Sequence, residues 1–188
     1  MKFVLTSLAL FVAATTATHA APIVSSSVEI PGTFQLDFET GTVGGVSPSA
    51  DIWWEQINDT TRVLNRGVGP SSFNDSALLA LGVIGDAGYA AITETDLFGY
   101  AYGTTPIAGP PGGTQLNIGG VFAVRTVEGN YAKAIVERYD TGTADREFYD
   151  MHIRYELFAP VPEPSTYALM LAGLLGLGFA ARRRHRKP

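Results

Sequence analysis

Apolar and polar residues alternate with a period of two along most of residues 21–160. Successive side chains of a β-strand point to opposite faces, so this alternation predicts half-buried strands rather than helices. The predicted strand segments are residues 32–40, 51–57, 77–84, 121–126, 131–139 and 149–158.

The alternation is clearest in the last two of these segments, which each divide into two faces. Residues 127–130 (VEGN) lie between the segments 121–126 and 131–139, and Gly129 can take the positive φ that a tight hairpin needs. One face carries Ala132, Ala134 and Val136 in the first segment, and Met151, Ile153, Tyr155 and Leu157 in the second. The opposite faces carry Tyr131, Lys133, Ile135 and Glu137 in the first, and His152, Arg154 and Glu156 in the second.

Glycine and proline are frequent between these segments, most of all in residues 102–115. A single helical turn is predicted at residues 93–100, because Thr93 and Asp96 have the spacing of a capping box. Several strands separated by turn signals are typical of an all-β domain. We therefore expect an antiparallel β-sandwich or a partly closed barrel over residues 21–160.

The N-terminal segment has the three parts of a secretory signal peptide. Lys2 supplies a positive start, residues 3–14 are uncharged and mainly apolar, and the small residues Thr18 and Ala20 precede a cleavage point after Ala20. The apolar run is too short to span a bilayer stably. Residues 1–20 are therefore predicted to direct the chain to the Sec export machinery.

Charge is divided unevenly along the chain. The formal net charge is −5, but six of the 13 basic residues lie in the signal segment or in residues 182–187, whereas all 18 acidic residues lie between residues 21 and 164. The middle of the chain is thus strongly acidic and would repel phosphate backbones, so we expect no nucleic-acid partner. The chain has no cysteine, which excludes disulfides and thiolate chemistry.

Residues 165–181 form an uncharged stretch rich in Leu, Ala and Gly, and they are predicted to be a transmembrane segment. The 15 residues 167–181 would rise only about 22 Å as a helix, so the span is marginal. Clustered basic residues hold their end of a membrane segment in the cytoplasm. The tail at residues 182–188 supplies such a cluster, which consists of Arg182, Arg183, Arg184, Arg186 and Lys187.

Immediately before this stretch lies Pro162-Glu163-Pro164. Each proline fixes its own φ and disfavours helix in the residue before it, so the three residues are predicted to be extended and accessible to a protease. Residues 161–188 resemble the PEP-CTERM sorting signal of Gram-negative bacteria, which joins this motif to a short apolar helix and an arginine cluster. The resemblance implies recognition by an exosortase, a membrane-embedded cysteine transpeptidase-like enzyme that removes the tail. The alternative is an ordinary single-pass anchor preceded by a proline-rich linker.

In that family the processed protein passes from the inner membrane to the cell surface, outer membrane or extracellular matrix, often alongside exopolysaccharide. The middle of the chain also resembles a β-rich module of exported bacterial proteins, through the stretches LDFETGTVGG, ADIWWEQIN and GGVFAVRTVEGNYAKAIVERY. Its EGNYAK hairpin is similar to that of secreted haem-binding proteins of the HmuY type. Those proteins use paired histidines, whereas the predicted mature domain offers His152 alone, so no cofactor is expected.

Two adjacent indoles are candidate ligand contacts. Trp53 and Trp54 lie on opposite faces of the predicted strand 51–57, so one is expected in the core, while the other can stack on a sugar ring. The structural alternative buries both rings or covers one with a loop. One histidine without a partner nearby in the sequence, such as His152, is most often structural.

Acidic residues offer weaker candidates. Asp37 and Glu39 share a strand face, as do Asp51 and Glu55, but spacing within a strand does not place two carboxylates across a cleft as a glycosidase requires. The turn at residues 140–145 (DTGTAD) is a candidate calcium site through Asp140 and Asp145, and a solvated hairpin loop is its alternative.

No motif of an enzyme family is present, so we expect no enzymatic activity. The sequence predicts an exported structural or adhesive protein of the cell surface or exopolysaccharide matrix. The alternative function is a secreted carbohydrate- or calcium-binding module.

Overall fold

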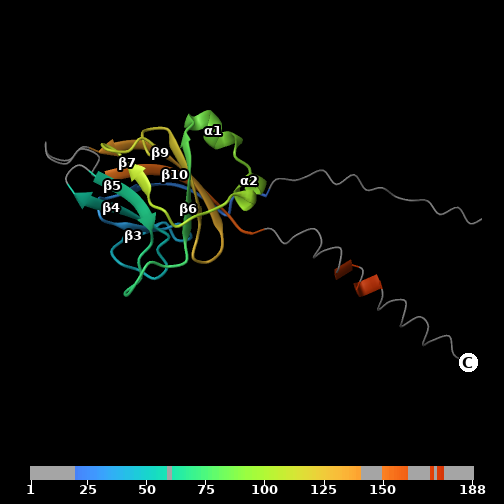
Figure 1. The fold of residues 1–188 in the computed structure, drawn as a ribbon. Coiled ribbons are helices and arrows are strands. Elements are labelled where there is room, and N and C mark those ends of the chain that lie inside the picture. Colours follow the sequence, from blue (N-terminus) through green and yellow to red (C-terminus); the bar gives the residue numbers. More distant parts are fainter. Residues whose placement is uncertain (1–19, 59–60, 141–149, 161–169, 172, 176–188) are drawn as a thin grey trace, which may run out of the picture.

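Two five-stranded antiparallel sheets pack face to face (Figure 1). The computed structural model describes residues 20–58, 61–140, 150–160, 170–171 and 173–175. The first sheet has the order β1 (Val24–Ile30), β10 (Asp150–Phe158), β9 (Tyr131–Asp140), β8 (Gly120–Arg125) and β6 (Ala77–Val83). The second sheet has the order β3 (Thr42–Gly44), β2 (Gln35–Asp37), β4 (Ile52–Asn58), β5 (Thr61–Arg66) and β7 (Ile107–Gly109).

The fold is therefore an all-β sandwich, as the alternation predicts. Within the described residues the sheets remain two separate layers and do not close into a barrel. The six predicted strand segments coincide with β2, β4, β6, β8, β9 and β10, and the ends of β4, β8 and β9 each extend one residue beyond the prediction. The predicted hairpin joins β8 to β9, and Gly129 adopts a φ of 86° in its turn.

The main core lies between the two sheets and takes one face of each strand. The face of β9 with Ala132, Ala134 and Val136 and the face of β10 with Met151, Ile153, Tyr155 and Leu157 both lie in this cluster. Phe38, Ile52, Trp54 and Leu64 join it from the side of the second sheet. The rings of Phe38 and Tyr155 meet edge to face with centroids 4.9 Å apart. Burial of each large apolar side chain contributes about 1.5–3 kcal/mol, so this layer supplies most of the stabilisation.

Two short helices cover part of the outer face of the first sheet. Helix α2 (Glu94–Gly99) has the predicted capping box, in which Asp96 N–H donates to Thr93 Oγ1 over 3.2 Å and Thr93 N–H donates to Asp96 Oδ2 over 2.8 Å. Helix α1 (Gly85–Ala91) was not predicted, because its seven residues GDAGYAA hold two glycines and no apolar stripe. Together the helices enclose a second, smaller core that includes Leu97, Val121 and Ile135.

The charged side chain of Lys133 is buried beneath these helices. Its Nζ donates to the carbonyl oxygens of Tyr89 over 3.2 Å and Ile92 over 2.9 Å, at the C-terminal end of α1. The same amine lies 3.2 Å from Glu156 Oε2, and its side chain is only 5% exposed. A buried ammonium needs such partners to offset its desolvation, so Lys133 holds α1 against the sheet.

In the described part of the chain, no helix has the length and apolar character needed to cross a membrane. Most of the predicted transmembrane segment 165–181 lies outside the described residues, as do the signal segment 1–19 and the basic residues 182–188.

Candidate functional site

A β-bulge in β9 decides which side chains reach the outer face of the first sheet. The register shifts between His152 and Ile153, where Glu137 is the extra residue of β9. An extra residue reverses the alternation, so the side chains beyond it change faces. Tyr139 consequently packs against the main core, and the side chain of Asp140 is 48% exposed on the other face.

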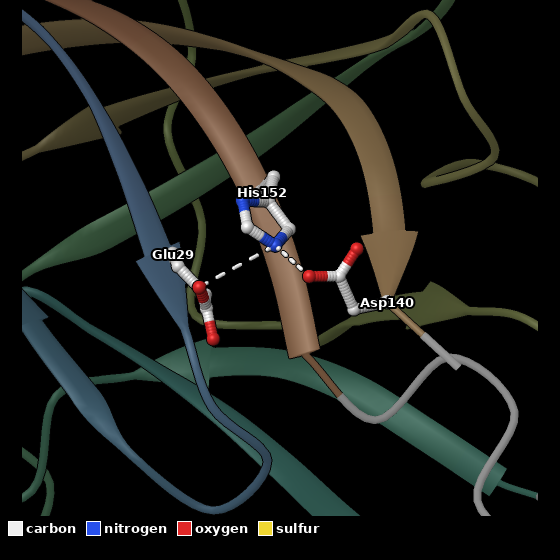
Figure 2. Close-up of side chains that lie close together, drawn as sticks. All are labelled: Glu29, Asp140 and His152. Carbon is white, nitrogen blue, oxygen red and sulfur yellow. Dashed lines mark hydrogen bonds and ion pairs between the residues drawn. The ribbon is translucent and has the colours of Figure 1, made fainter. Parts of the chain in front are cut away.

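The reversal places Asp140 beside His152 and Glu29, which come from three adjacent strands (Figure 2). Glu29 on β1 is the direct cross-strand partner of His152 on β10. His152 Nε2 lies 2.8 Å from Asp140 Oδ2 and 3.6 Å from Glu29 Oε2. The imidazole is 11% exposed, whereas each carboxylate side chain is 48% exposed. The cluster therefore has a fixed ring and two accessible acids.

Arg138 closes one side of this cluster. Its Nε donates to Asp140 Oδ1 over 3.2 Å, and its Nη2 lies 3.3 Å from His152 Nε2. The hydrogen bonds from His152 and Arg138 hold the pKa of Asp140 below its usual value. His152 Nε2 thus has an acceptor and a donor within reach, and a single protonation state of the ring can satisfy only one of them.

A single ion can contact all three members of the cluster. One ligand atom of each residue, Glu29, Asp140 and His152, lies within 4.8 Å of the other two. The sequence indicated Asp140 but coupled it with Asp145, which lies outside the described residues. The calcium site at Asp140 and Asp145 stays a prediction. The sequence pattern gave no signal for Glu29, because it precedes His152 by 123 positions and only strand pairing brings them together.

A second group of acids lies near the end of the β8–β9 hairpin. Asp51 is fully buried, and its two carboxylate oxygens accept from the backbone N–H groups of Phe38 and Val127, each over 2.9 Å. Glu39 Oε1 accepts from Thr126 Oγ1 over 2.7 Å and from Asn130 Nδ2 over 2.8 Å. These acids therefore connect the second sheet to the hairpin turn of the first.

Burial first and the neighbouring Glu39 second raise the pKa of Asp51 to about 8, against the lowering effect of its two backbone hydrogen bonds. Oxygen atoms of Asp37, Glu39 and Asp51 lie within 4.8 Å of one another. Glu39 Oε2 is buried and has no donor among the other described groups. With this raised pKa, Asp51 is mostly protonated at neutral pH beside the Glu39 carboxyl.

The structure pairs the predicted acids differently from the sequence. Asp37, Glu39 and Asp51 form one group. Glu55 lies outside this group and accepts a hydrogen bond from Asn65 Nδ2 over 3.1 Å. Because Asp51 is wholly buried, this group lacks the open cleft between two carboxyls that glycoside hydrolysis uses.

The two adjacent tryptophans face opposite ways. Trp54 is completely buried in the main core, where its ring lies 5.9 Å from that of Tyr139. Trp53 is half-buried on the outer face of the second sheet, and its Nε1 donates to the carbonyl oxygen of Thr33 over 3.0 Å. Only Trp53 presents ring surface to solvent.

Comparison with known families concerns the segment that follows β10. A family model described as the PEP-CTERM protein-sorting motif matches residues 160–184. The chain carries a PEP-CTERM sorting motif. The match includes Pro162, Glu163 and Pro164 together with Arg182, Arg183 and Arg184, and it identifies the chain as an exported substrate of an exosortase.

Solved structures provide two distant likenesses to the PEP-CTERM protein. A candidate lipoprotein from Bacteroides fragilis NCTC 9343 is 13% identical with a TM-score of 0.37, and the match covers 74% of this chain and 91% of that one. An apo HmuY analog from Tannerella forsythia is 12% identical with a TM-score of 0.31, covering 73% and 97%. Likeness at this level says nothing about ligands or activity. No curated protein sequence matches the chain.

The PEP-CTERM motif begins directly after the sandwich is complete. Strand β10 ends at Phe158, two residues before the matched segment, and it lies between β1 and β9 in the first sheet. Cleavage within residues 162–164 would therefore keep every strand that the structure describes and leave the hydrogen bonds of β10 intact.

Proposed function

We propose that this protein is a structural or adhesive component of the bacterial cell surface or exopolysaccharide matrix. An exosortase-like enzyme releases or transfers it from the inner membrane at Pro162–Pro164. The observation that carries the proposal is the PEP-CTERM motif at residues 160–184, directly after the last strand of a complete sandwich. The strongly acidic middle of the chain supports the proposal, because such a surface stays hydrated outside the cell.

Mass spectrometry of the native protein in its host tests the sorting step. We expect a mature species that begins at Ala21, ends near Pro164 and is found in the outer fraction or the medium. Glu163→Ala combined with Pro164→Ala removes the acid and the restriction on the residue before the second proline. This variant should keep its basic tail and accumulate in the inner membrane.

Pro70→Ala is the matched control, because Pro70 is an exposed proline outside the motif. It should be processed and located like the parent. A parent protein that retains Arg182–Lys187 in the inner membrane would contradict the proposal and favour a plain anchored protein.

Carbohydrate binding is the second candidate function, and the position of Trp53 favours it. Trp53 pairs directly with Gln35, whose side chain lines a groove of about 240 Å³ on the second sheet. Asp37, Thr40, Thr42, Ser47 and Ser49 also line the groove. Trp53 does not itself line the groove, but it neighbours Gln35, which does. Hydroxyl and carboxylate groups near a half-buried indole suit a sugar, which presents both hydroxyls and an apolar face.

If this candidate is correct, Trp53→Ala should weaken binding to exopolysaccharide purified from the host by about tenfold or more, which corresponds to about 1.4 kcal/mol of lost stacking. Binding can be measured by glycan array and by titration calorimetry. Phe73→Ala is the control, since Phe73 is an aromatic residue that is 43% exposed and lies outside β2 and β4. Equal binding by both variants would reject Trp53 as a sugar contact.

A further inference from the structure

We propose that Glu29, Asp140 and His152 form a binding site for a divalent transition-metal ion, with Zn²⁺ as the representative ion. The three residues lie on β1, β9 and β10, which are neighbours in the first sheet (Figure 2). One imidazole nitrogen and two carboxylate oxygens are a donor set that suits zinc and related late first-row ions. Calcium, in contrast, prefers oxygen ligands alone and more of them.

The distances between the donor atoms match a shared ion. Ligand atoms about 2.0–2.2 Å from zinc lie roughly 2.9 Å apart at a right angle and roughly 3.4 Å apart at a tetrahedral angle. His152 Nε2 lies 2.8 Å from Asp140 Oδ2 and 3.6 Å from Glu29 Oε2. Both distances from the imidazole are within a few tenths of an ångström of one of these values, the two carboxylate oxygens lie within 4.8 Å of each other, and the half-exposed carboxylates have room to adjust.

The sheet positions the imidazole for this role. Met151 and Ile153, on either side of His152, are both fully buried in the main core, so the backbone of β10 cannot shift easily. The ring itself is only 11% exposed. The bulge at Glu137 turns Asp140 towards the ring, and bulges commonly re-aim a side chain beside a functional site.

Arg138 leaves the relevant oxygen of Asp140 available. It donates to Oδ1, whereas Oδ2 faces His152. Hydrogen bonds to the non-ligating atoms of a metal-bound carboxylate orient it, so this contact is compatible with binding. The Nη2 of Arg138 competes with an ion for the lone pair of His152 Nε2. The Arg138 side chain is 59% exposed, so its terminus can move into water when an ion binds.

Three protein ligands leave at least one position for water or an external ligand, which is the layout of an open zinc site rather than a closed structural one. The two accessible carboxylates make the site reachable from solution. This inference concerns the first sheet alone and does not depend on the sorting of the protein or on its role in the matrix.

Titration calorimetry of the purified full-length chain, without an affinity tag and in mild detergent, tests the proposal with ZnCl₂ as the probe. We expect saturable binding of one zinc ion to the site and a rise of several degrees in Tm with excess zinc. His152→Gln should weaken this binding by at least a hundredfold, because loss of a ligand should cost no less than the 10–100-fold typical of a residue that only orients one. Glu29→Gln should weaken it as well, and this half-exposed position minimises effects on folding.

The chain offers a matched control in its other histidines, His19 and His185, which lie in the predicted signal and basic tail. The double variant His19→Gln/His185→Gln should retain the zinc affinity and the Tm shift of the parent. Circular dichroism without zinc verifies that each variant is folded. Equal zinc affinity of the parent and both site variants would overturn the proposal. So would the absence of saturable binding up to 1 mM zinc, or saturable binding of CaCl₂ instead of ZnCl₂.

Discussion

Gly67→Ala is expected to prevent native packing at the end of β5. A Cβ atom at this position would lie 1.7 Å from the carbonyl oxygen of Ala50 and 2.5 Å from its carbonyl carbon. Both are backbone atoms, so no side-chain rotation relieves the clash. The backbone is also fixed on both sides, because Gly67 N–H donates to Asp51 O over 2.9 Å and Gly67 O accepts from Asn74 N–H over 3.0 Å.

The added methyl group must therefore separate two chain segments that are hydrogen-bonded to each other. We expect the free energy of unfolding to fall by more than about 4 kcal/mol, a large part of the 5–15 kcal/mol typical of a domain. Urea unfolding followed by tryptophan fluorescence measures this loss, because Trp54 is fully buried.

Gly69→Ala is the matched control in the same loop. Its added Cβ would meet no atom closer than Ser72 O at 3.7 Å, which is ordinary van der Waals contact. We expect its stability to lie within about 1 kcal/mol of the parent, and even to rise slightly, because alanine restricts the unfolded chain. Similar urea midpoints for the two variants would contradict the close packing at Gly67.

The parts of the fold that the sequence predicted are those governed by local pattern. Alternation marks β9 and β10 because each is covered on one face by the main core, and Thr93 with Asp96 marks the start of α2. The sorting motif is likewise contiguous in the sequence. Strand β1 escaped prediction because it is an edge strand whose sequence, VSSSVEI, contains three consecutive serines.

The candidate metal site could not be assembled in the same way. Strict alternation in β9 would place Asp140 on the face of Ala134 and Val136, towards the core. The bulge reverses that assignment, and bulges leave no dependable signal in a single sequence. His152 therefore looked solitary, although Glu29 faces it across the strand pair. The need for glycine at position 67 could not be predicted from the sequence either, because the backbone atoms that would clash with a side chain there belong to Ala50.

The second large effect concerns pH. Asp51 has a pKa of about 8 in the folded protein, well above its ordinary value of 3.8. Between these values the folded chain binds more protons than the unfolded chain, so the contribution of Asp51 to stability is fully present near pH 4 and is lost as pH rises towards 8. The slope is at most about 1.4 kcal/mol per pH unit. The carboxyls of Asp37, Glu39 and Glu128 and the phenol of Tyr155 surround this position and add no positive charge to offset ionisation.

Glu39→Gln should reduce this pH dependence. The amide oxygen of glutamine can keep the hydrogen bonds from Thr126 and Asn130, while its N–H group can donate to ionised Asp51. Asp51 can then lose its proton without facing a second carboxylate. We expect the free energy of unfolding at pH 8 to rise by about 1–3 kcal/mol relative to the parent, with a smaller difference at pH 4.

Urea unfolding at intervals from pH 4 to pH 9 measures this effect. Other carboxyls also titrate in this range, so the informative quantity is the difference between variant and parent at each pH. Glu55→Gln is the control, because Glu55 accepts from Asn65 and lies outside the Asp37–Glu39–Asp51 group. Its stability curve should stay parallel to that of the parent. If the Glu39→Gln curve is parallel as well, the Glu39 carboxyl does not raise the pKa of Asp51, and the pH dependence of the sandwich above pH 4 has another origin.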